Sequence, residues 1–281
     1  MVAVVSYFSA CDIVDEPYLI KQKPPDTTTP PDTTQIIQKV LLEDYTGHDC
    51  NNCPAAAVEA HDLQGIYGEQ LIVIAVHAGH FARPIPQDPA LASDYRCEAG
   101  ETWYDFFKTE ANPIGLVNRI ETSPGSYLVE WGQWGTTVGQ EVLKEPQAGM
   151  TIDNTFNESN RMLETTITTR FITEQTDQFN LIVVVAQDSI IDGQKNKDPL
   201  IGETPLIEHY VFMHMLRGSL NGDWGEQLTT DDPVEVEKDY VTSISYTFPE
   251  EWIPKDCHVV AFIYSNQTKT ILQVEEAAVL E

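Results

Sequence analysis

The hydrophobic positions of residues 36–149 follow the pattern of an α/β domain. Residues 40–42 and 71–77 are continuous apolar runs of strand length, as expected for strands that are buried on both faces. Good helix formers occupy residues 55–60, and apolar side chains recur at spacings of three and four between residues 131 and 142. We therefore predict alternating strands and helices, with parallel strands, in this part of the chain.

Residues 150–281 show a different pattern. Residues 165–172 and 240–248 alternate between apolar and polar positions, whereas residues 180–186 and 209–216 have the composition of buried strands. Glycine and proline separate these runs, and no long helical period appears. Strands with turn signals between them predict an all-β domain, an antiparallel sandwich of the immunoglobulin-like kind.

The first 35 residues lack the pattern of a packed core. Residues 1–10 are apolar and end in small residues directly before Cys11, which is typical of a lipoprotein signal peptide whose cysteine becomes lipidated. Residues 12–35 are rich in proline and threonine and contain a small internal repeat, so we expect an extended tether. The predicted organisation is a signal remnant and tether over residues 1–35, an α/β domain over residues 36–149 and a β-sandwich domain over residues 150–281.

Two cysteines, Cys50 and Cys53, follow the first apolar run and a turn. Pro54 stands where a first helical residue is expected, so the pair lies at a predicted helix N-terminus. The free N–H groups and the helix dipole there favour a thiolate at Cys50, and Cys53 is close enough to resolve a mixed disulfide. The pattern indicates a dithiol/disulfide site, with a structural disulfide as the alternative. Because zinc normally needs four ligands and the chain has no second CxxC, no metal and no other cofactor is predicted.

The chain has five cysteines, and lipidation of Cys11 would account for the odd number. Cys97 and Cys257 then either form a disulfide that joins the two halves of the chain or remain two separate buried thiols. Spacing alone does not give connectivity, so both alternatives stay open.

The composition is strongly acidic, with a formal net charge of −28 from 16 basic and 44 acidic residues. No basic stripe is available to neutralise phosphates, which excludes nucleic acid as a partner. The same charge disfavours anionic lipid headgroups at the folded surface, so we expect contact with a membrane through the lipid anchor only. High acidity is typical of a protein that must stay soluble on a crowded cell surface.

The order of elements around the CxxC resembles the thioredoxin family. In that family a cis-proline before the third strand packs beside the two cysteines, and Pro113 occupies the matching position. An acidic residue six positions before the first cysteine is buried beneath the second and helps to move its proton, and Asp44 stands there. His48 is expected either to stabilise the Cys50 thiolate or to be an exposed turn residue.

This chain also departs from thioredoxin. Asn51 and Asn52 replace the Gly-Pro of thioredoxin itself, and no tryptophan precedes the first cysteine. The residues between the cysteines help to set the reduction potential, so the direction of electron flow stays open.

Four longer segments make the resemblance narrower. They resemble the outer-membrane-protein-28 family of bacterial lipoproteins, and they read LLEDYTGHDCNNCP, NPIGLVNR, MLRGSLNGDWGE and VVAFIYSNQTKTILQVEEA. The resemblance implies a lipid-anchored N-terminus, a thioredoxin-like domain and a C-terminal β-domain. It also implies a location at the outer membrane or cell surface of a Gram-negative bacterium, but little about activity.

Two main functions remain open, with a metallochaperone that uses Cys50, Cys53 and a histidine such as His48 or His80 as a distant third. In the first, the protein exchanges disulfides with protein or peptide thiols: Cys50 attacks, Cys53 resolves, Pro113 supports the substrate backbone and Asp44 accepts a proton. In the second, it is a surface binding or adhesion lipoprotein for an unknown ligand, and the two cysteines form a permanent staple. The first function requires sulfurs that solvent can reach, with Pro113 against them.

Overall fold

The computed structural model describes residues 36–228 and 234–280, and Ile36–Glu281 forms one compact unit. The signal remnant, the tether and the lipidation site predicted at Cys11 lie outside the described residues. The fold is mostly β, with both parallel and antiparallel pairing. No helix within the described ranges is long and apolar enough to cross a membrane.

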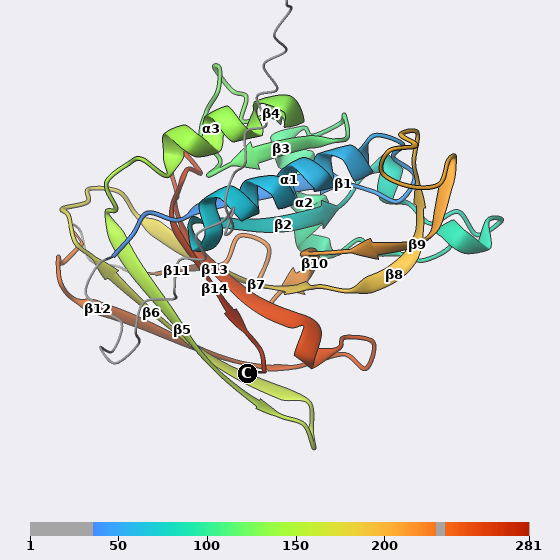
Figure 1. The fold of residues 1–281 in the computed structure, drawn as a ribbon. Helices are drawn as coiled ribbons and strands as arrows, with labels where there is room; N and C mark the ends of the chain where they lie inside the picture. The colour runs from blue at the N-terminus through green and yellow to red at the C-terminus, as the bar shows by residue number, and fades with distance from the viewer. Residues whose placement is uncertain (1–35, 229–233, 281) are drawn as a thin grey trace, which may run out of the picture. The chain divides into compact units, whose positions relative to one another are not determined.

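A nine-stranded mixed sheet forms the centre of the unit (Figure 1). Its strands are β1 (Val40–Thr46), β2 (Leu71–His77), β3 (Ile114–Val117), β4 (Val129–Glu130), β7 (Phe179–Gln187), β10 (Met215–Ser219), β11 (Glu226–Gln227), β13 (Cys257–Ser265) and β14 (Ile271–Ala278). Their order is β14-β13-β7-β10-β2-β1-β3-β4, and β11 also pairs with β7. β2 pairs in parallel with β1 and with β10, whereas the other pairs are antiparallel.

Strands from both sides of residue 150 therefore share one sheet. The link is β10, in which Met215 pairs with Ala75 of β2 and Leu216 pairs with Ala186 of β7. The domain boundary predicted at residue 150 stays a prediction, but hydrogen bonding in the sheet is continuous across it.

Three α-helices of the described chain cover this sheet: α1 (Cys53–Tyr67), α2 (Glu98–Phe107) and α3 (Trp134–Glu141). α1 and α3 pack on one face of β1 and β2, where Leu63 and Val138 join the same apolar cluster. α2 packs on the opposite face through Trp103, whose cluster also contains Phe262 of β13. One apolar core thus reaches from β1 to β13. Single 3₁₀ turns lie at Gly68–Gln70, His80–Ala82, Pro89–Leu91, Trp131–Gln133 and Pro254–Asp256.

A second, three-stranded layer covers the other face of β7 and β13. It consists of β5 (Ala148–Asn157), β6 (Met162–Phe171) and β12 (Asp239–Thr247), paired antiparallel in the order β12-β6-β5. Along β7, Val183 contacts this layer's apolar cluster, whereas Val184 faces the core beneath α2. Burial on both faces explains why β7 is continuously apolar, and burial on one face explains why β12 alternates.

A separate hairpin is inserted between β7 and β10. It comprises β8 (Ile190–Lys195) and β9 (Leu206–Phe212), which pair only with each other among the strands of the described chain. The prediction of one strand over residues 209–216 is wrong, because β9 ends at Phe212 and a separate strand, β10, begins at Met215. His214 lies at the break with a left-handed φ of 54°, which a regular strand does not allow.

A buried ion pair between Arg119 and Glu43 lies in the core, where β1, α2 and β13 meet. The guanidinium of Arg119 donates two hydrogen bonds to the carboxylate of Glu43, at 2.8 and 2.6 Å, and both side chains are fully buried. The guanidinium also lies 4.7 Å from the ring centre of Trp103 and 5.1 Å from that of Phe262. Arg119 therefore holds β1, α2 and β13 together.

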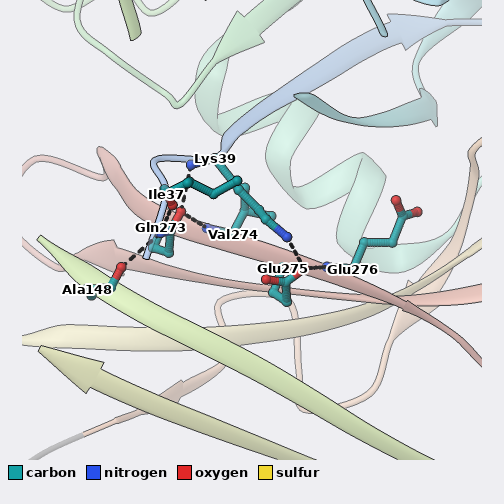
Figure 2. Close-up of polar contacts among 7 residues, drawn as sticks. All are labelled: Ile37, Lys39, Ala148, Gln273, Val274, Glu275 and Glu276. Atoms are coloured by element: carbon teal, nitrogen blue, oxygen red, sulfur yellow. Dashed lines mark hydrogen bonds and ion pairs between the residues drawn. The ribbon is translucent and has the colours of Figure 1, made fainter. Parts of the chain in front are cut away.

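The start of the described chain is clamped to the last strand by Gln273 (Figure 2). Its side-chain amide donates to the carbonyl oxygens of Ile37 (2.9 Å) and Ala148 (2.8 Å). Its carbonyl oxygen accepts from the N–H groups of Lys39 (3.0 Å) and Val274 (3.2 Å). The ammonium of Lys39 also pairs with Glu275. One buried side chain thus connects residues before β1 with β5 and β14.

Candidate functional site

The loop between β1 and α1 carries the two cysteines. α1 begins at Cys53 with a proline in its first turn, and Cys50 and Cys53 form a disulfide with Cα atoms 5.5 Å apart. The loop turns tightly at Gly47, where a Cβ atom would lie 2.4 Å from the carbonyl carbon of Phe81. Any side chain at that position would therefore clash with the neighbouring backbone. The predicted order of strand, turn, CxxC and helix occurs in the structure.

The disulfide is buried beneath the β8–β9 hairpin. Cys50 and Cys53 are each only 2% exposed. The side-chain amide of Gln194, on β8, donates to the carbonyl oxygen of Cys50 at 3.0 Å. The N–H of Lys195 donates to the carbonyl oxygen of His48 at 2.8 Å. A reactive sulfur must be reached by its partner, so this cover limits direct access to Cys50 in the observed conformation, whereas Cys53 also lines the cavity described below.

Pro113 lies at the start of β3, beside the turn that leads to the cysteines. The Asn112–Pro113 peptide bond is cis, and the proline is buried. The pairing of Tyr45 with Ile114 places Pro113 next to Thr46, the last residue of β1. The Asn112 side chain donates to the carbonyl oxygen of Thr46 at 3.0 Å and fixes this approach.

Asp44 is buried in β1, six residues before Cys50. Its side chain is 3% exposed, and its Oδ1 atom has no hydrogen-bond partner among the described residues. Loss of hydration disfavours the charged form and raises the pKa of this carboxyl to about 7. Asp44 and Cys53 line the same cavity, so Asp44 lies on the side of the site that contains the second cysteine.

That cavity has a volume of about 220 Å³. β1, β2 and α1 form its inner wall, and Tyr210 and Phe212 of β9 form the opposite wall. Its outer lining includes Val58, Val211 and Met213, which are 45%, 48% and 43% exposed. The cavity therefore reaches solvent between α1 and the hairpin, through an apolar mouth.

The family profile described as "Outer membrane protein Omp28" matches residues 100–281. The chain belongs to the Omp28 family. Membership places this Omp28 chain in the outer membrane of a Gram-negative bacterium. The matched region begins after Cys53, so it assigns no chemistry to the disulfide. No curated protein matches the chain in sequence.

Several solved structures are similar to this Omp28 chain. HBP35 of Porphyromonas gingivalis is 15% identical, with a TM-score of 0.63, covering 87% of this chain and 76% of that one. Protein AGR_C_4864 from Agrobacterium tumefaciens is 11% identical, with a TM-score of 0.51, covering 88% of this chain and 97% of that one. A domain of the outer membrane lipoprotein Omp28 from Porphyromonas gingivalis is 16% identical, with a TM-score of 0.31, covering 48% and 90%. At these identities HBP35 and the Agrobacterium protein support the fold alone.

Two histidines of this Omp28 chain lie close to the cysteine loop. His48 is 1% exposed, and its Nε2 atom lies 3.0 Å from the carbonyl oxygen of Arg83, so the expectation of an exposed turn residue is wrong. Burial lowers the pKa of His48. His77, at the end of β2, is a cavity residue whose role the sequence did not reveal. It is 2% exposed, both ring nitrogens lack a hydrogen-bond partner in the described chain, and burial lowers its pKa to about 3.

The remaining cysteines are separate thiols. Cys97 precedes α2 and Cys257 begins β13, and neither is in a disulfide. Burial raises the pKa of Cys97 to about 11 and that of Cys257 to about 12, which makes both thiols poor nucleophiles. The alternative of a disulfide between them is therefore not realised in the structure. Residues 36–228 and 234–280 contain no group of three or more histidine, cysteine or acidic side chains arranged to hold a metal ion.

Proposed function

We propose that this chain is a lipid-anchored recognition protein of the outer membrane, in which Cys50–Cys53 is a permanent structural disulfide. The observation that carries the proposal is the burial of both cysteines, each 2% exposed, beneath a hairpin from the distant half of the chain. A dithiol catalyst presents its first sulfur to large substrates, whereas this loop is hydrogen-bonded to β8. Lipidation of Cys11 would hold the protein at the membrane.

The scaffold of this proposal combines a thioredoxin-like part with a sandwich-like part. The parallel β1 and β2 with α1 between them, the antiparallel β3 and β4, and the cis bond at Pro113 support the thioredoxin-like plan. The packing of the β5-β6-β12 layer on β7 and β13 supports a two-layer β arrangement of the immunoglobulin-like kind. A rigid scaffold of this type presents loops and cavities for recognition.

The test is the resistance of the disulfide in the folded protein. Oxidised protein is incubated with dithiothreitol or with reduced thioredoxin, and new thiols are trapped by alkylation and located by mass spectrometry. We expect slow modification of Cys50 in the native state and rapid modification once the chain is unfolded. Reduction in the native state at the unfolded-state rate would overturn the proposal. Radiolabelled palmitate incorporation that is lost in Cys11→Ser checks the anchor.

Thiol–disulfide exchange is the second candidate, and the buried carboxyl of Asp44 favours it. In that reaction the Cys50 thiolate attacks a substrate disulfide and releases one substrate thiolate. Cys53 gives its proton to Asp44 and attacks the mixed disulfide, which leaves the substrate as a dithiol and the site as a disulfide. The reverse sequence oxidises a substrate dithiol. Pro113 would support the substrate backbone.

Insulin reduction, coupled to a dithiol donor, separates the two candidates. The second candidate requires activity in the wild type that disappears in Cys50→Ser and falls in Asp44→Asn. The first requires that wild type and Cys50→Ser be equally inactive. Retained folding of each variant is checked by circular dichroism.

A further inference from the structure

The cavity beside the disulfide has apolar walls and an unsatisfied polar end. Most of its wall is aliphatic or aromatic, including Ala60, Val73 and Phe212. On the inner wall formed by β1 and β2, called the inner end below, Asp44 Oδ1 and both nitrogens of His77 lack hydrogen-bond partners in the described chain. Leaving a buried polar atom unpaired typically costs about 1–3 kcal/mol, so such groups in a folded protein call for an explanation. A ligand that fills the cavity and carries hydrogen-bond donors would supply partners for the Asp44 oxygen and for the unprotonated nitrogen of His77.

The chemistry of the inner end selects the charge of that ligand. A carboxylate accepts hydrogen bonds and attracts a positive charge, and its bonds to charged donors are about twice as strong as neutral ones. His77 stays neutral because burial lowers its pKa to about 3, so it accepts a hydrogen bond without repelling a cation. The net charge of −28 also concentrates small cations near the protein and repels anions.

We propose that this cavity binds a small primary ammonium group carried on an apolar chain. The ammonium reaches Asp44 and His77 at the inner end, and the chain lies along the apolar wall toward Val58 and Val211 at the mouth. This inference gives the proposed recognition function a ligand class, and it rests on that function. The ammonium group belongs either to a free alkylamine or to a lysine side chain of a peptide.

Three ligands of one length test the charge preference in the unmodified protein. n-Pentylamine, 1-pentanol and pentanoate are titrated into the oxidised wild type at pH 8, and binding is followed by ligand-observed NMR. We expect n-pentylamine to bind about tenfold more tightly than 1-pentanol, and pentanoate to bind most weakly. Equal affinity for the amine and the alcohol, tighter binding of pentanoate, or no saturable amine binding would each overturn the proposal.

The pH dependence has a definite sign. Because burial raises the pKa of Asp44 to about 7, the affinity for n-pentylamine should fall about tenfold from pH 8 to pH 6, as the carboxylate takes up a proton. The other ionisable side chains facing the cavity are His61, His77, Tyr210 and His214. Tyr210 stays neutral because burial raises its pKa to about 12, and protonation of a histidine would disfavour the cation in the same direction. The affinity for 1-pentanol should not change.

Substitutions identify the residue responsible. Asp44→Asn should abolish the preference for the amine over the alcohol and retain binding of 1-pentanol, whereas Asp62→Asn, at an exposed position of α1, should change neither. An unchanged preference in Asp44→Asn would contradict the assignment, and the wild-type titrations stand even if this variant does not fold. Nα-acetyl-lysine amide distinguishes the sources: binding indicates a peptide lysine, and binding of n-pentylamine alone indicates a free amine.

The same samples separate this inference from the proposed function. Native-state reduction of the disulfide is measured alongside each titration. Loss of amine selectivity with a resistant disulfide overturns the ligand class alone. A disulfide that is reduced readily overturns the structural role of Cys50–Cys53, whatever the cavity binds.

Discussion

The Gln273 clamp and the Asp44 cavity are both buried and polar, and they are organised in opposite ways. Gln273 makes four hydrogen bonds to backbone groups of three segments, so its donors and acceptors are used. Asp44 and His77 leave three side-chain atoms unpaired at comparable burial. The first region contributes to stability through complete pairing. The second region is less stabilising, because its unpaired polar atoms form no hydrogen bonds, but those atoms remain available to bind a ligand or a proton. Breaking each region in turn tests this contrast.

The largest effect is expected in the paired part of the core. Arg119→Met removes one partner of the fully buried pair with Glu43 and leaves an uncompensated carboxylate. We expect the free energy of unfolding to fall by about 3–5 kcal/mol, measured by urea denaturation. The double variant Glu43→Leu/Arg119→Met should recover much of this loss. A loss of less than 1 kcal/mol in the single variant would contradict the prediction, because it would show that the unpaired carboxylate of Glu43 does not destabilise the folded state.

The unpaired region should show a stability that depends on pH. The pKa of Asp44 rises from an ordinary value of 3.8 to about 7 on folding, so the folded state retains a proton that the unfolded state releases. Stability from this group is fully present below pH 4 and is lost as pH rises through 7, by up to about 4 kcal/mol.

Asp44→Asn should therefore be more stable than wild type at pH 8 and similar to it at pH 4. The measurement is urea denaturation at both pH values, with Asp62→Asn as the matched control on an exposed position. A stability difference between wild type and Asp44→Asn that stays constant with pH would argue against a raised pKa.

Removing the clamp should have a smaller effect. Gln273→Ala leaves the carbonyl oxygens of Ile37 and Ala148 without their donor, and we expect a loss of about 2–3 kcal/mol in the free energy of unfolding. Gln267→Ala, on the exposed turn between β13 and β14, is the matched control and should change stability by less than about 0.5 kcal/mol. Equal changes in the free energy of unfolding for the two substitutions would mean that the hydrogen bonds of Gln273 do not contribute to stability.

The disulfide is expected to contribute least, because it closes a very short loop. Cys50→Ala/Cys53→Ala should lower the free energy of unfolding by about 2 kcal/mol according to the loop-entropy relation. Thermal denaturation with and without reductant measures this directly. If reductant lowers the melting temperature of the double variant as much as that of the wild type, another thiol is responsible.

The sequence predicted local structure well where burial of an element determines which of its positions are apolar. The apolar runs of β2 and β7 are strands buried on both faces, and the helix after the CxxC begins at Cys53. Periodicity does not encode which strands become neighbours. The sharing of one sheet by both halves depends on β10, whose strand pairing with β2 consists of the single pair Met215 and Ala75. No local signal in the sequence reveals that pairing.

The site was only partly predictable for the same reason. Cys50, Cys53 and Asp44 were found from motif spacing, which is local. The cover over Cys50 comes from Gln194, 144 residues away, so the sequence could not show that the cysteines are buried. His77 stood out in the sequence only as the end of an apolar strand, three residues before His80. Its lack of hydrogen-bond partners depends on the packing of Phe212 and Tyr95 against its ring.

The Gln273 clamp also determines where mechanical load would enter this protein. The Pro/Thr segment ends at residue 35, and the clamp grips the backbone at Ile37 and Lys39. In a chain held at a membrane by its N-terminal segment, drag on the folded part would pull first on these contacts with β14. Force would then pass to the strand next to the C-terminus before it reached β1 and the cysteine loop, so the cavity would be shielded from tension at the tether.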